Sequence, residues 1–127
     1  MKYKHHIIGN HYLKLNFSTS VFQFSDGVFV IDIDNIALQH IPDDDVLRVL
    51  SAIVGNCAMQ LGVELGLSMV EIEETLFKYS KDMYRKTLDV LQKWKKGCEI
   101  KPTIRMLMKA MQASDPRGLH FLISRYA

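Results

Sequence analysis

The stretch QLGVELGLSMVEIEETL, residues 60–76, decides the fold because it predicts two amphipathic helices with almost no loop between them. Gly66 can adopt the left-handed backbone conformation that closes the first helix. Ser68 can cap the second helix, and Glu71, three residues later, completes a Ser-x-x-Glu capping box. The stretch therefore predicts a tight helix–turn–helix corner, which occurs in DNA-binding proteins, repeat proteins and small bundles alike.

The composition is typical of a single globular domain. The chain has 127 residues, of which 48% are hydrophobic, and its formal net charge is +2. This hydrophobic fraction is enough for a core, whereas so small a charge does not by itself indicate nucleic acid. We expect no signal peptide, because no apolar run of about 7–15 residues follows the lysines near the start. We expect no membrane span either, because no apolar run reaches the roughly 20 residues that a span needs. With Cys57 and Cys98 isolated from each other, we expect a cytoplasmic protein with reduced thiols.

The pattern of hydrophobic residues changes near residue 41. Residues 11–33 alternate apolar and polar positions and are rich in β-branched and aromatic side chains, which predicts strands. The dipeptide Asp26-Gly27 favours a tight hairpin turn. Beyond residue 41 the spacing becomes helical throughout. We therefore expect a β-rich segment over residues 1–40, or the end of an upstream domain, followed by a helical domain over residues 41–127.

The helical domain is predicted to contain six short helices in a compact antiparallel bundle. In the helix that starts at Ser68, we expect Val70, Ile72 and Leu76 to face the core. In the first helix, the same spacing assigns Ile53 to the apolar face. The core residues that we expect are Leu61, Leu65, Ile72, Leu91 and Trp94.

Three stretches resemble the death domain, a module of apoptosis and innate-immunity adaptors. AMQLGVELGLS at residues 58–68 resembles the second helix of that family, and EIEETL at residues 71–76 resembles the third. TLDVLQKWKKG at residues 87–97 resembles the fourth helix, in which a leucine three positions before a tryptophan anchors the core. Leu91 and Trp94 occupy these two positions.

The resemblance covers about residues 42–126, with two departures. Ala58 stands where the family usually has a tryptophan, and Gly62 stands where alanine is common. The resemblance implies an all-α six-helix antiparallel bundle of Greek-key topology, preceded here by the β-rich segment. It also implies a signalling adaptor that assembles with another death domain, on an identical or a different chain. Catalytic residues, cofactors and small-molecule substrates are not part of that expectation.

Charge is divided unevenly along the helical domain. Residues 41–75 hold seven carboxylates and one arginine, whereas residues 76–110 hold ten basic residues and three carboxylates. A module with an acidic and a basic patch is complementary to copies of itself, although solvated helix surfaces also carry such charges. In the family, second and third helices contact the first and fourth helices of another copy. The candidate protein-binding residues are Glu64, Glu71, Glu73 and Glu74 on the acidic side, and Lys81, Arg85, Lys86 and Lys93 on the basic side.

Nucleic-acid binding is the main alternative, because the basic fourth helix could lie along phosphates. However, the helix after Ser68 would bring Glu71, Glu73 and Glu74 against those phosphates. We therefore expect a protein partner first, nucleic acid second and an enzyme third.

A metal site has little support in the sequence. His5, His6 and His11 lie close together near the N-terminus, where such residues are more typical of an exposed tail than of a metal centre. We expect no metal and no cofactor.

Overall fold

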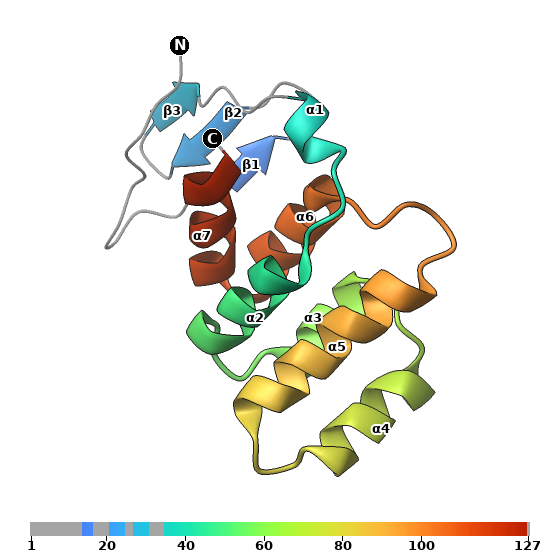
Figure 1. The fold of residues 1–127 in the computed structure, drawn as a ribbon. Helices are drawn as coiled ribbons and strands as arrows, with labels where there is room; N and C mark the ends of the chain where they lie inside the picture. The colour runs from blue at the N-terminus through green and yellow to red at the C-terminus, as the bar shows by residue number, and fades with distance from the viewer. Residues whose placement is uncertain (1–13, 17–20, 25–26, 31–34, 127) are drawn as a thin grey trace.

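The computed structural model describes residues 14–16, 21–24, 27–30 and 35–126. Within these residues the chain forms three short strands followed by seven helices (Figure 1). The elements are β1 (Lys14–Asn16), β2 (Val21–Phe24), β3 (Gly27–Val30), α1 (Asn35–Leu38), α2 (Asp44–Ile53), α3 (Ala58–Glu64), α4 (Met69–Lys78), α5 (Met83–Gly97), α6 (Ile104–Ser114) and α7 (Pro116–Tyr126).

The three strands form an antiparallel sheet in the order β1-β2-β3, and β1 lies next to α6. Phe24 of β2 is paired with Gly27 of β3. Asp26, the first residue of the predicted turn dipeptide, lies outside the described residues, as do His5, His6 and His11. What the N-terminal segment contributes to the protein therefore stays a prediction.

The helices pack as a bundle, as the sequence predicts. Helix α2 contacts α5 and α7, while α3 contacts α5 and α6, and α6 packs along α7. Helix α4 lies at the edge of the bundle and packs against α3 and α5 (Figure 1). Among the described residues, none of the helices is both long and apolar enough to cross a membrane.

Short polar residues fix where the helices begin. The side chains of Asp43, Asp82 and Thr103 each accept a hydrogen bond from a backbone N–H in the first turn of α2, α5 and α6. At the corner between α3 and α4, Gly66 has a φ of +83°. Ser68 forms the predicted capping box with Glu71, the third residue of α4. The corner is therefore built by local chemistry that the sequence displays.

The core lies between the helices and begins earlier in the chain than the sequence indicates. All five residues expected in the core are buried: Leu61, Leu65, Ile72, Leu91 and Trp94. Leu38 of α1 is buried with them, and the backbone N–H of Ile104 donates to the carbonyl oxygen of His40 at 2.8 Å. Packing of the bundle therefore starts before residue 41, the boundary that the sequence predicts.

Two predicted core positions are wrong. Val70 is 67% exposed and Ile53 is 37% exposed. Two residues of helix rotate the side chain through about 200°, so Val70 points away from the bundle when Ile72 points into it. Ile53 is the last residue of α2, where the next residue, Val54, is buried in its place.

Helix α4 approaches α3 closely at Gly62. A Cβ atom at this position would lie 2.8 Å from Cγ1 of Ile72, closer than side-chain atoms pack. Ile72 therefore fills the space that a side chain at position 62 would take, which explains why glycine stands here. Ile72 and Thr75 are the only residues of α4 that are buried.

A buried carboxylate joins the α2–α3 loop to the start of α7. Asp115 accepts hydrogen bonds from the backbone N–H of Gly55 at 2.8 Å, and from the backbone N–H and Nη2 of Arg117, both at 2.9 Å. Burial raises the pKa of this carboxyl group, but the hydrogen bonds from Arg117 and Gly55 outweigh burial and leave the pKa below its ordinary value. The ionised form of Asp115 therefore stabilises the folded chain.

Truncation of two neighbouring residues tests the orientation of α4. Ile72→Ala should lower the free energy of unfolding by about 2–5 kcal/mol, because it empties a core position. Val70→Ala is the matched control and should change it by less than about 0.5 kcal/mol, since this side chain is exposed. Urea unfolding measures both, and equal losses would contradict the orientation of α4.

The Asp115 contacts predict a pH dependence of stability. Asp115→Asn should cost about 2 kcal/mol at neutral pH, because a charged hydrogen-bond acceptor is lost. In the wild type this stabilisation is complete above about pH 4, the ordinary range of a carboxyl group, and declines as the pH falls through the lower folded-state pKa. The variant should lack that decline. Asp45→Asn, which removes an exposed partner of Arg48, should leave the unfolding curve unchanged, and an equal cost at both sites would refute the role of Asp115.

Candidate interaction surface

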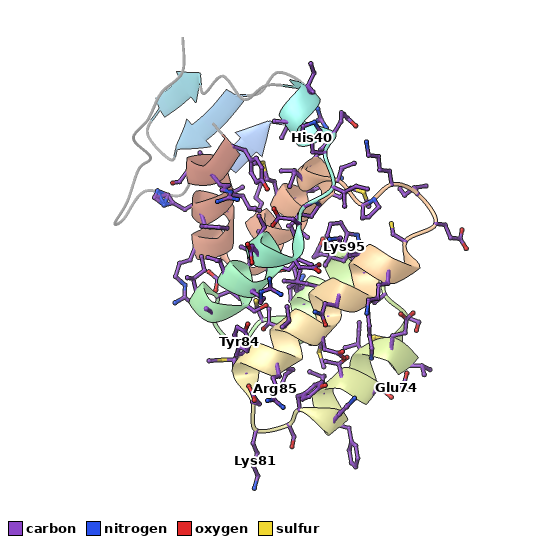
Figure 2. All side chains as sticks on the ribbon, viewed as in Figure 1. His40, Glu74, Lys81, Tyr84, Arg85 and Lys95 are labelled. Carbon is purple, nitrogen blue, oxygen red and sulfur yellow. The ribbon has the colours of Figure 1, made fainter. Side chains whose placement is uncertain are left out.

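The outer side of α4 carries an exposed stripe of two apolar and two acidic residues. Val70, Glu73, Glu74 and Phe77 recur at positions i, i+3, i+4 and i+7, so they share one face of the helix. All four are exposed, and Phe77 is 88% exposed. Figure 2 shows Glu74 on the side of α4 that faces away from α5. We call these four residues the outer stripe of α4.

The other two predicted acidic residues have local partners. Glu64, at the end of α3, is exposed and accepts a hydrogen bond from the side-chain amide of Gln60 at 2.9 Å. Glu71 is half-buried, and its carboxylate accepts hydrogen bonds from the hydroxyl of Ser68 at 3.0 Å and from its backbone N–H at 3.3 Å. Glu71 therefore serves the capping box, and the outer stripe is the part of the acidic group with free carboxylates.

Three of the predicted basic residues gather where the chain turns from α4 into α5. Lys81 precedes α5, and Arg85 and Lys86 lie in its first turns. Figure 2 shows Lys81 at the tip of the turn and Arg85 beside it. Nε of Arg85 lies 3.5 Å from Oδ2 of Asp82, in an exposed pair that contributes little to stability. We call Lys81, Arg85 and Lys86 the basic corner.

A shallow groove of about 230 Å³ opens at the basic corner. Its lining residues are Tyr79, Tyr84, Arg85, Leu88, Asp89 and Gln92. Two aromatic rings and a leucine make its walls apolar. The guanidinium group of Arg85 adds a positive charge, whereas the carboxylate of Asp89 is already bound by Lys93 and Thr75. Nζ of Lys78 lies 5.3 Å from the centre of the Tyr79 ring, which adds a second cation near the rim. The groove therefore has the character of a site for an apolar side chain with acidic neighbours.

The fourth predicted basic residue, Lys93, does not belong to this corner. Its Nζ donates to the carbonyl oxygen of Glu71 at 3.0 Å and to Oγ1 of Thr75 at 2.8 Å. The same Nζ lies 3.4 Å from Oδ2 of Asp89, and the hydroxyl of Thr75 donates to that carboxylate. The ammonium group thus joins α5 to α4 within the chain, apart from the basic corner, and a role of Lys93 in protein binding stays a prediction.

A second lysine of α5 is also engaged within the chain. Nζ of Lys95 lies 3.1 Å from Oδ1 of Asp44, in the first turn of α2. The hydrogen bond from Lys95 and its charge lower the pKa of the Asp44 carboxyl group. Figure 2 shows Lys95 on the side of α5 that faces α2. The lysines of α5 therefore do not form one continuous exposed stripe.

Other chemistry has little support in the part of the chain that the structure describes. No group of three or more histidine, cysteine or acidic side chains is placed there to hold a metal ion. Cys57 and Cys98 are both free and half-buried. Burial and the nearby Asp115 carboxylate raise the pKa of the Cys57 thiol, which makes the reactive thiolate less available.

Sequence analysis did not identify Val70 and Phe77 as surface residues. The spacing of apolar residues in α4 is compatible with two different buried faces, one with Ile72 and Leu76 and one with Val70 and Phe77. Only contact with α3 and α5 decides between these faces.

Comparisons with protein-family models and with curated proteins find no match to this sequence. The outer stripe of α4 and the basic corner therefore provide the main support for a function.

Proposed function

We propose that this chain is a protein–protein interaction module that associates with a second copy of itself through the outer stripe of α4 and the basic corner. The observation that carries the proposal is Phe77. An aromatic side chain that is 88% exposed is costly to keep in water, and here it lies one helical turn after two exposed carboxylates, Glu73 and Glu74. Aromatic residues in such positions are typical anchors of protein interfaces.

The two surfaces are complementary in charge and in apolar character. In the proposed contact, Phe77 of one copy packs against Tyr79 and Leu88, which line the groove of another copy. Glu73, one helical turn before Phe77, pairs with Arg85, which lines the same groove. The apolar anchor supplies affinity, while the charges steer the two copies and fix their orientation.

The resemblance to death domains supports the same type of contact. In that family, acidic second and third helices meet basic helices of another copy, and α3 and α4 correspond to those acidic helices by their sequences. The setting that this resemblance implies is an adaptor in apoptosis or innate-immune signalling. A different chain of the same family is the alternative partner, and it would present the same kind of basic corner.

Nucleic acid is a weaker candidate for the basic corner. Lys93 and Lys95 are bound within the chain, and the carboxylates of the outer stripe lie on the neighbouring helix. A phosphate backbone would meet both signs of charge within a short distance.

Removal of the aromatic ring tests the anchor. Phe77→Ala should weaken self-association by about 2 kcal/mol, roughly 30-fold in Kd, as truncation of an interface anchor does. Its stability should match the wild type, because Phe77 makes few contacts within the chain. Ile100→Ala, another exposed apolar residue, is the control and should associate normally. Analytical ultracentrifugation measures association, and an unchanged Kd for Phe77→Ala would contradict the proposal.

Charge reversal tests whether the two surfaces are halves of one contact. Glu73→Lys damages only the acidic half and Arg85→Glu only the basic half, so each variant alone should fail to associate. A mixture of the two should recover dimers, because each variant retains the half that the other lacks. Lys109→Glu on α6 carries a comparable charge change away from both surfaces and should behave as wild type. Normal association of both single variants would show that these charged side chains are solvated and take no part in a contact between copies.

A further inference from the structure

Lys93 differs from the other basic residues of α5 in what surrounds it. Its side chain is 28% exposed, and its ammonium group has three oxygen partners within the chain. Two of these partners belong to α4, the carbonyl of Glu71 and the hydroxyl of Thr75, and the third is the carboxylate of Asp89 on α5. We call this set the Lys93 clamp.

The clamp fixes how α4 is rotated about its own axis. Ile72 and Thr75 are the only buried residues of this helix, so Ile72 alone provides a deep apolar contact. Leu76 is only partly buried against the core, so the apolar contact of α4 is narrow, and a helix held by a narrow contact can roll about its axis. Lys93 binds α4 at two points a full turn apart, Glu71 and Thr75, and so prevents this roll.

The rotation of α4 decides where the outer stripe points. Glu73 and Glu74 lie between the two residues that Lys93 holds, on the exposed side of the helix. A roll of one residue step, about 100°, would turn the whole outer stripe, Phe77 included, and bring one edge of it towards the bundle.

We propose that Lys93 is a positioning residue for the acidic half of the self-association contact, although it is a basic residue of α5. This inference rests on the proposed function. The positive charge of Lys93 suggests the basic half of the contact, whereas the inference assigns this residue to the acidic half. The ammonium group acts through α4 and does not touch the second copy.

Complementation between variants tests this assignment. Lys93→Glu puts a carboxylate beside Asp89 and the Glu71 carbonyl, which repels α4 from its position. It should therefore fail to associate alone, and it should form dimers when mixed with Arg85→Glu, which has an intact acidic half. Mixed with Glu73→Lys it should form none, because both acidic halves are then damaged. General destabilisation would prevent dimers in both mixtures, so the pattern separates positioning from loss of fold.

Two further variants and a second measurement complete the test. Lys96→Glu, an exposed charge reversal on the same helix, should associate like the wild type. Lys93→Met, which removes the ties without adding a charge, should show the same complementation pattern as Lys93→Glu. Hydrogen exchange followed by mass spectrometry should show faster exchange in α4 of both Lys93 variants, with α6 unchanged.

The outcomes separate the inference from the proposed function. Dimers of Lys93→Glu with Glu73→Lys, dimers with neither partner, or wild-type exchange in α4 would each overturn the role of Lys93 alone. A wild-type chain that stays monomeric at every concentration would overturn the proposed function, and the role of Lys93 with it.

Discussion

The close approach of α3 and α4 at Gly62 is the contact on which the surface of this protein depends. Ile72 occupies the space that a side chain at position 62 would fill, and this draws α4 against the bundle by one deep apolar contact. Because α4 is attached along so narrow a face, most of its circumference remains in solvent. Val70 and Phe77 are therefore exposed as a consequence of how Ile72 is buried.

The charged residues of the helical domain divide into those bound within the chain and those left outside. Asp115, Lys93 and Lys95 each tie two segments together through hydrogen bonds or ion pairs. Glu73 and Lys81 have no such role in the described structure, and they lie near an exposed aromatic ring and an apolar groove, respectively. The presence of charged residues alone is thus a poor guide to an interface. Charged side chains that are not bound within the chain and lie beside exposed apolar surface are a better guide.

Local chemistry could be predicted from the sequence, and long-range packing could not. The left-handed Gly66 and the Ser68 capping box depend on residues within a few positions of each other, so the corner was predictable. The burial of Trp94 followed from helical spacing. The partners of Lys93 on α4 are distant in sequence, and a count of charges cannot find them. The exposure of Val70 likewise depends on which face of α4 meets α3.

The central claim is that two copies associate through complementary charges around an apolar anchor, and light scattering tests it most directly. Molar mass should be measured after size-exclusion chromatography over a range of protein and salt concentrations. We expect the mass to rise above that of a monomer with protein concentration, and to fall back as salt shortens the Debye length below about 8 Å, its value at physiological ionic strength. A monomer under every condition, or an association that salt does not weaken, would contradict the account.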